Sequence, residues 1–209
     1  MGTDAKGQNV GGSSWRFVKA MWPVVFNYTV VTLVALGFFY TSLINTSRPL
    51  DASQHDALTR AIDVLAERGF EREVLLLRHF ATYRATDNWI NAMAEKENAF
   101  AATNFPFGVI TLYPDFFSKA NDSTERAMIL LHESRHLIGG SEKDAYTYVW
   151  QNRHRIGWTI LSHGTTPAFV SIETITREEA PELFTCPEML WQDCTETLRN
   201  PSKVRLANN

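Results

Sequence analysis

The chain has 209 residues, enough for one ordinary domain of about 150 residues and further material at one end. Its formal net charge is -3 and 21% of its residues are charged, so no broad positive field favours nucleic acid, and we expect no nucleic-acid partner. A hydrophobic content of 44% and an aromatic content of 12% exclude a largely disordered chain.

The N-terminal part contains a long apolar run. Residues 22–45, WPVVFNYTVVTLVALGFFYTSLIN, include no charged side chain. A helix of about 20 mainly apolar residues crosses a bilayer. We therefore expect a tail at residues 1–20, a transmembrane signal anchor at 21–45 and a folded domain at 46–209.

The charges before the apolar run predict its orientation. Three basic residues face a single acidic one, Asp4, on this flank: Lys6, Arg16 and Lys19. The positive-inside rule then keeps the N-terminus cytoplasmic and makes the domain extracytoplasmic, which means periplasmic if the organism is bacterial. A cleaved signal peptide is the alternative, because Ala35 to Gly37 forms a small-x-small cleavage site within a shorter apolar run.

The next part of the chain has helical periodicity. Apolar residues recur at helical spacing from Asp51 to Gly69, with Asp51 or Ser53 as a cap and Gly69 as a stop. The following stretch, EREVLLLRHFATYRATDNWINAMAEKE, predicts a second helix and a short third one near residues 89–93. The early part of the domain is therefore expected to be helical.

A strand signal follows at Val109 to Tyr113, where β-branched and aromatic residues lie between Gly108 and Pro114. The proline at its end predicts an edge strand. The expected fold class is therefore mainly α with a small edge-strand element, an α+β arrangement.

Two further helices follow this strand. Asp122 or Ser123 can cap the first, with Glu125 completing a capping box, and the pair at 139–140, Gly-Gly, ends it. The residues from Ala127 to Leu131 are apolar on all sides of this helix, which predicts that it is buried. Ser141 is a good cap for the next helix, and a last helix is expected within residues 167–184.

Two cysteines, Cys186 and Cys194, lie close together near the C-terminus, on the side expected to be exported. In an oxidising compartment such a pair forms a disulfide that closes a small loop. Two unpaired thiols are the alternative.

The chemistry is concentrated in the segment HESRH. His132 and His136 are four residues apart, so on a helix both imidazoles lie on one face and can bind one Zn²⁺. Glu133 lies about 100° further round the helix, where it can act as general base on a water at the open coordination position. A zinc site that performs hydrolysis is the function that this spacing favours.

This pattern resembles the signature of the zincin metallopeptidases, and the resemblance covers roughly Asp122 to Tyr148. It implies a zincin-like fold, a bound Zn²⁺, and a peptide or protein substrate. It also implies an edge strand that lines the substrate cleft and pairs with extended peptide, and the stretch GVITLYP stands where that strand should be.

The third zinc ligand has two candidates. Glu142 gives a spacing similar to the metzincins, and it begins EKDA, which resembles the Glu-x-x-Ala of gluzincin-like families. Asp144 resembles the aspzincin ligand in GSEKD. Asp144 also completes a capping box with Ser141, so we favour Glu142 as ligand and keep Asp144 as the alternative.

The predicted function is a membrane-anchored zinc metallopeptidase with Glu133 as its base. The alternative is a noncatalytic zinc-binding or degenerate zincin-like module that serves protein interaction at the membrane. In that case a fourth protein ligand should close the site. Tyr146 and Tyr148 are candidates either for an oxyanion donor or for ordinary core residues.

Overall fold

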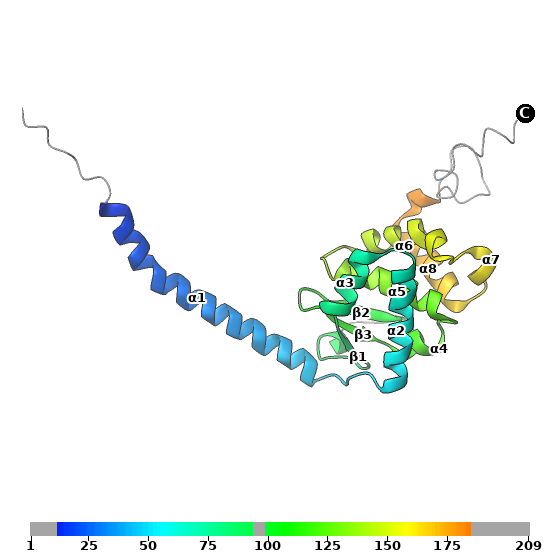
Figure 1. Ribbon diagram of the computed structural model, residues 1–209, viewed down its shortest axis with the longest axis horizontal. Coiled ribbons are helices and arrows are strands. Elements are labelled where there is room, and N and C mark those ends of the chain that lie inside the picture. Colours follow the sequence, from blue (N-terminus) through cyan, green and yellow to red (C-terminus); the bar gives the residue numbers. More distant parts are fainter. Residues whose placement is uncertain (1–11, 94–98, 185–209) are drawn as a thin grey trace, which may run out of the picture. The chain divides into compact units, whose positions relative to one another are not determined.

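The computed structural model describes residues 12–93 and 99–184, and gives only the backbone for residues 12–20. Cys186 and Cys194 lie outside the described residues, so their disulfide stays a prediction. The helices and strands, labelled in Figure 1, follow the chain in this order: α1 (Gly12–Asn45), α2 (Ala52–Glu67), α3 (Glu71–His79), β1 (Thr82–Arg84), the 3₁₀ turn η1 (Asn91–Met93), β2 (Ala101–Asn104), β3 (Val109–Leu112), α4 (Pro114–Ser118), α5 (Ser123–His136), α6 (Glu142–Ile156), α7 (Ile160–His163), α8 (Pro167–Glu179) and the 3₁₀ turn η2 (Pro181–Leu183). The fold is mainly α-helical with a small sheet, as expected.

The chain divides into two units, Met1–Ser42 and Leu43–Asn209. The first consists of most of α1, of which Met21–Asn45 is long and apolar enough to cross a membrane. A signal sequence near the N-terminus would have the same properties. The second unit, called the domain below, begins a few residues before the expected start at residue 46.

The last turn of α1 belongs to the domain. Leu43 is fully buried and Ser47 is 7% exposed. The guanidinium of Arg84, on β1, donates to the carbonyl oxygens of Ile44 and Ser47. Arg84 therefore holds the end of α1 and the residues just after it against the domain, where intrahelical hydrogen bonds end.

The domain core forms around α5. This helix packs against α2, α3, α6 and β2. Residues 127–131 are all buried, which confirms the expectation drawn from their apolar character. Asp51 caps α2 with the side chain of Gln54 completing a capping box, so the first helix of the domain begins where the sequence predicts.

The sheet has the strand order β1-β3-β2, with β1 parallel and β2 antiparallel to β3. The prediction of an edge strand at Val109 to Tyr113 is therefore wrong: β3 is the central strand, and its four residues are buried. Pro114 is the first residue of α4 and lies after the strand, so its missing N–H removes no hydrogen bond from the sheet. The edge strand that packs on α5 is β2.

Two other details differ from the sequence predictions. The helix expected near residues 89–93 is the single 3₁₀ turn η1. Asp122 caps α5, but the Glu125 carboxylate accepts from the backbone N–H of Asn121 and not from that of the cap residue. Glu125 is fully buried and also accepts from the hydroxyl of Thr166. The position of its carboxylate therefore depends on a residue far away in the sequence.

Candidate metal centre

Helix α5 holds the two histidines in fixed positions. Its buried apolar residues fix how it packs, and His132 and His136 lie one turn apart near its C-terminal end. Their imidazole centres are 4.7 Å apart. Their side chains are 12% and 15% exposed, so both rings lie mostly inside the domain but are accessible from one side.

The turn after α5 brings Glu142 back to the histidines. Gly139 has a φ of 79°, which favours glycine. A Cβ on Gly140 would lie only 2.9 Å from the carbonyl oxygen of Arg135, so the close approach of the two backbones requires glycine there too. Ser141 then caps α6, and Glu142 is its first residue. The Gly-Gly pair therefore reverses the chain within one turn.

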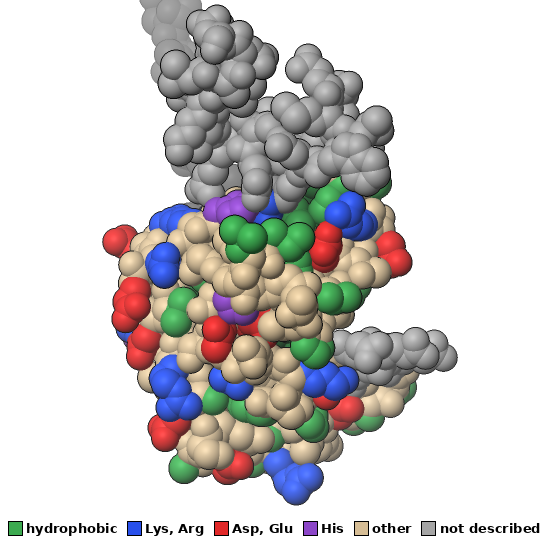
Figure 2. Space-filling model, turned by 90° about the vertical axis from the view of Figure 1, so that its right-hand side faces the viewer, with side chains coloured by type: hydrophobic (Ala, Val, Ile, Leu, Met, Phe, Trp, Pro, Cys, Tyr) green, Lys and Arg blue, Asp and Glu red, His purple; other side chains and the backbone are tan. Residues whose placement is uncertain are grey.

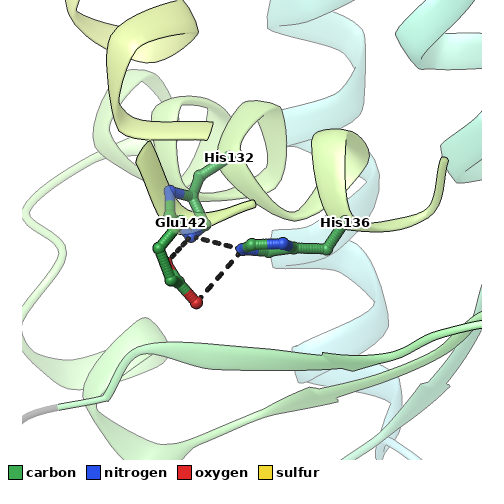
Figure 3. A group of neighbouring side chains, drawn as sticks. All are labelled: His132, His136 and Glu142. Atoms are coloured by element: carbon green, nitrogen blue, oxygen red, sulfur yellow. Dashed lines mark hydrogen bonds and ion pairs between the residues drawn. The ribbon is translucent and has the colours of Figure 1, made fainter. Parts of the chain in front are cut away.

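Three side chains point toward one another at this place, two from α5 and one from α6 (Figure 3). The two Nε2 atoms are 3.0 Å apart. The Glu142 carboxylate oxygens lie 3.3 Å from Nε2 of His132 and 3.4 Å from Nε2 of His136. Figure 2 shows a histidine lying against acidic side chains near the middle of the face that it draws.

The donor positions fit a metal ion. A tetrahedral zinc ion with bonds of about 2.0–2.1 Å keeps its ligand atoms about 3.3 Å apart. The 3.0 Å between the two Nε2 atoms and the 3.3 Å from His132 Nε2 to Oε2 of Glu142 are close to that value, and the other carboxylate oxygen, Oε1, lies 3.4 Å from His136 Nε2. His132, His136 and Glu142 therefore form a group that could hold a metal ion. Two imidazoles and one carboxylate suit zinc, although the same donors also bind other transition metals.

The hydrogen bond on the far side of His136 supports this arrangement. Its Nδ1 lies 2.9 Å from the carbonyl oxygen of Gly140. A carbonyl can only accept, so Nδ1 carries the proton, and in the neutral ring the lone pair of Nε2 faces His132 and Glu142, the other two candidate ligands. A backbone carbonyl behind a metal-binding histidine commonly fixes the ring in this way.

The pKa values of His136 and Glu142 are both shifted by the close contact between these side chains. Burial lowers the pKa of His136, but the hydrogen bond with Glu142 and the negative charge of Glu133 outweigh it and raise the pKa to about 9. The hydrogen bond from His132 and, to a smaller extent, the one from His136 hold the pKa of the Glu142 carboxyl well below its usual range. Both shifts arise because the imidazoles and the carboxylates lie so close together.

Asp144, the alternative third ligand, is engaged elsewhere. Its Oδ2 accepts from the hydroxyl of Ser141 at 2.8 Å and from the backbone N–H of Ser141 at 3.2 Å. The second contact, together with the 3.2 Å hydrogen bond that the backbone N–H of Asp144 donates to the Ser141 hydroxyl, forms the capping box of α6. The structure therefore brings Glu142, and not Asp144, to the two histidines.

Glu133 is held beside this group by a residue that the sequence did not single out. Its side chain is buried, with the residue only 3% exposed, and Oε2 accepts a hydrogen bond of 2.6 Å from the hydroxyl of Thr103, on β2. Thirty positions separate the two residues, and the sequence contains no signal for their contact. Thr103 fixes one carboxylate oxygen and leaves the second for other partners.

A cavity of about 390 Å³ lies in front of these residues. It is lined by the three candidate ligands and Glu133, by residues 99–103 in and before β2, and by apolar residues of α5, α6 and α8 that include Ile129, Val149 and Ile172. Nothing in the sequence marks β2 or α8 as part of the site, because neither carries a recognisable motif.

The chain was compared with family models, curated proteins and solved structures. None matches it. The interpretation of the site therefore rests on its geometry and on the motif.

The two candidate tyrosines lie in different surroundings. Tyr146 lines the cavity, and its ring centre is 4.4 Å from that of His132. Burial, followed by the charges of nearby carboxylates, raises its pKa, so the hydroxyl keeps its proton. Tyr148 donates instead to the Glu73 carboxylate at 2.9 Å, outside the cavity. Of the two, only Tyr146 is placed to act in the site.

Proposed function

We propose that the protein is a membrane-anchored zinc metallopeptidase that hydrolyses peptide bonds. One observation carries the proposal: the three ligands His132, His136 and Glu142 converge on one point at the wall of a cavity that Glu133 also lines. A buried carboxylate beside three metal ligands is what metal-assisted hydrolysis requires.

A bound zinc ion would supply a Lewis acid that makes water more acidic and polarises the carbonyl under attack. Glu133 accepts the proton of the attacking water and can later deliver it to the leaving amine. Thr103 orients Glu133 by occupying Oε2, so that Oε1 is the oxygen left to act as base. Tyr146, which stays protonated, donates to the oxygen on which negative charge develops.

A peptide substrate fits the wall of the cavity. Within the described residues β2 pairs only with β3, and residues 101–103 of β2 line the cavity. An extended peptide can add to such an edge through main-chain hydrogen bonds, and apolar residues such as Ile129 and Val149 can receive a side chain. The combination of a strand edge and an apolar wall supports a peptide or protein substrate.

The ligand count favours catalysis over a purely structural zinc site. Structural zinc is normally held by four protein ligands, whereas catalytic zinc has three and an open position. Among the described residues the candidate metal site contains three side chains. The Asp144 carboxylate is not a fourth, because it accepts hydrogen bonds from Ser141 at the start of α6. The Glu142 side chain is 59% exposed, so the group is open on one side.

We further propose that α1 anchors the protein, with the N-terminus cytoplasmic and the domain on the other side of the membrane. The length and hydropathy of Met21–Asn45 and the basic residues before it support this arrangement.

The proposal is tested with the full chain in lipid nanodiscs. Zinc content is measured first, and a chelator should remove the metal and lower the melting temperature. New amino termini are then counted by mass spectrometry after incubation with a mixture of denatured proteins. Glu133→Gln should retain zinc and lose roughly 10²–10⁴-fold in rate, because it removes the general base.

Glu178→Gln, which alters an exposed glutamate on α8, is the control and should remain active. A chain that binds no zinc, or a Glu133→Gln variant as active as the wild type, would contradict the proposed function.

A further inference from the structure

A short uncharged turn presents two large apolar side chains to solvent. The segment 88–93, NWINAM, follows β1 and ends in η1. Trp89 is 40% exposed and Met93 is 76% exposed. Single exposed apolar residues are ordinary on protein surfaces, so their exposure alone does not indicate a binding surface.

The turn is held by buried polar side chains. The Oδ1 atom of Asn88 accepts from the backbone N–H of Ile90 and of Asn91, each at 3.1 Å. Asn88 donates to the side chain of Asn104 at 2.7 Å, and Asn104 donates to the side chain of Asn91 at 2.8 Å. Asn88 is fully buried and Asn91 is 6% exposed. This network ties the turn to β2 and fixes how it displays Trp89.

The turn also contacts the residue that follows the apolar helix. The backbone N–H of Trp89 donates to the hydroxyl of Thr46 at 3.3 Å, and Thr46 comes directly after the last residue of the candidate membrane span, Asn45. The span of 25 residues is about 37 Å long, whereas the hydrocarbon core is about 30 Å thick. The end of α1 therefore reaches the headgroup layer, which is about 5–8 Å thick on each side.

We infer that Trp89 and Met93 insert into the boundary between headgroups and acyl chains of the membrane that α1 spans. This inference rests on the proposed anchoring by α1 and is independent of the peptidase activity. Tryptophan is enriched at this depth because its ring is apolar and its N–H can bond to water or headgroups. The turn thus gives the domain a second attachment to the bilayer.

Other exposed apolar residues provide the contrast. Leu161, on α7, is 97% exposed. Within the domain α7 and β1 lie on opposite sides (Figure 1). The turn begins four residues after the end of β1, and Thr86, which lies between them, accepts from the backbone N–H of Arg48, close to the end of α1. A domain held at the membrane by the turn keeps Leu161 in water.

The experiment compares the full chain in phosphatidylcholine–phosphatidylglycerol nanodiscs with the same chain in nanodiscs whose acyl chains are brominated and quench tryptophan. The fluorescence emission of Trp89 is obtained by subtracting the emission of the Trp89→Phe variant from that of the wild type. Leu161→Trp adds a matched exposed tryptophan on α7. We expect the Trp89 emission to be lost in brominated lipid and the emission added by Leu161→Trp to be unchanged.

Equal Trp89 emission in both lipids would refute the inference, as would equal quenching at both sites, which indicates unspecific adsorption. The anchor is checked separately through Trp22, whose emission is the difference from Trp22→Phe. Quenching of Trp22 without quenching of Trp89 leaves the anchor intact and overturns only the attachment of the turn. If Trp22 is not quenched, the anchoring fails and the inference fails with it.

Discussion

The assignment of Glu142 as third ligand leads to a prediction with a matched control in the same helical turn. Glu142→Gln keeps the shape of the side chain but removes its charge. The side chain is 59% exposed, so the dielectric constant of water is the appropriate limit. At about 2.1 Å from an ion of charge +2, the lost attraction is then about 4 kcal/mol, or roughly a thousandfold in the zinc dissociation constant.

The assay is competition for zinc with a chromophoric chelator, carried out on the full chain at neutral pH. Asp144→Asn is the control: it removes a charge two residues away and weakens the cap of α6, so it should lower the melting temperature slightly and leave zinc affinity close to wild type. If Asp144→Asn releases zinc while Glu142→Gln retains it, the ligand assignment and the reasoning from donor distances are both refuted.

Three further predictions separate metal binding, stability and catalysis. Gly140→Ala should weaken zinc binding by roughly 10–100-fold, because its Cβ would meet the Arg135 carbonyl and displace the Gly140 carbonyl that orients His136. Gly157→Ala, at a left-handed position after α6, should destabilise the domain without changing zinc affinity. Tyr148→Phe should lower the free energy of unfolding by about 1–3 kcal/mol, since it leaves the buried Glu73 carboxylate without that donor, and should leave hydrolysis unchanged. Tyr146→Phe should instead slow hydrolysis by about 10²–10³-fold with zinc retained. Denaturation curves, chelator competition and peptide release measure these three outcomes.

Local signals in the sequence predicted the parts of the site that depend on local structure. The cap at Ser141 with its capping box and the buried character of residues 127–131 are read from neighbouring residues, and both are present. The face shared by His132 and His136 follows from helical geometry alone. For these features neighbouring residues were a sufficient guide, whereas the capping box expected at Glu125 failed because distant contacts hold that carboxylate.

The choice of third ligand depends on how two helices cross. Glu142 and Asp144 both lie in the first turn of α6, about 200° apart around its axis, so they point in different directions. Which of them meets the histidines is decided by the turn through Gly139 and Gly140 and by the packing of α6 on α5. A pattern of spacings carries no information about that packing.

The strand β2 could not be predicted for a related reason. Three of its four residues, two alanines and an asparagine, are of types depleted in strands, and all four residues are only partly buried. They become a strand because they pair with β3, Ala101 opposite Leu112 and Asn104 opposite Val109. Thr103 thereby reaches Glu133, a contact between residues that no local pattern connects.

The burial of the last turn of α1 also limits where the chain can be processed. Leu43 is fully buried in the domain, and Arg84 binds the carbonyl oxygens of Ile44 and Ser47. Cleavage after Leu43 would remove that core side chain, although both carbonyl oxygens that Arg84 binds would remain in the chain. Cleavage after Gly37 would leave both contacts intact, so the two accounts of the apolar helix, anchor and signal peptide, predict the same folded domain and differ only in whether it remains attached to the membrane.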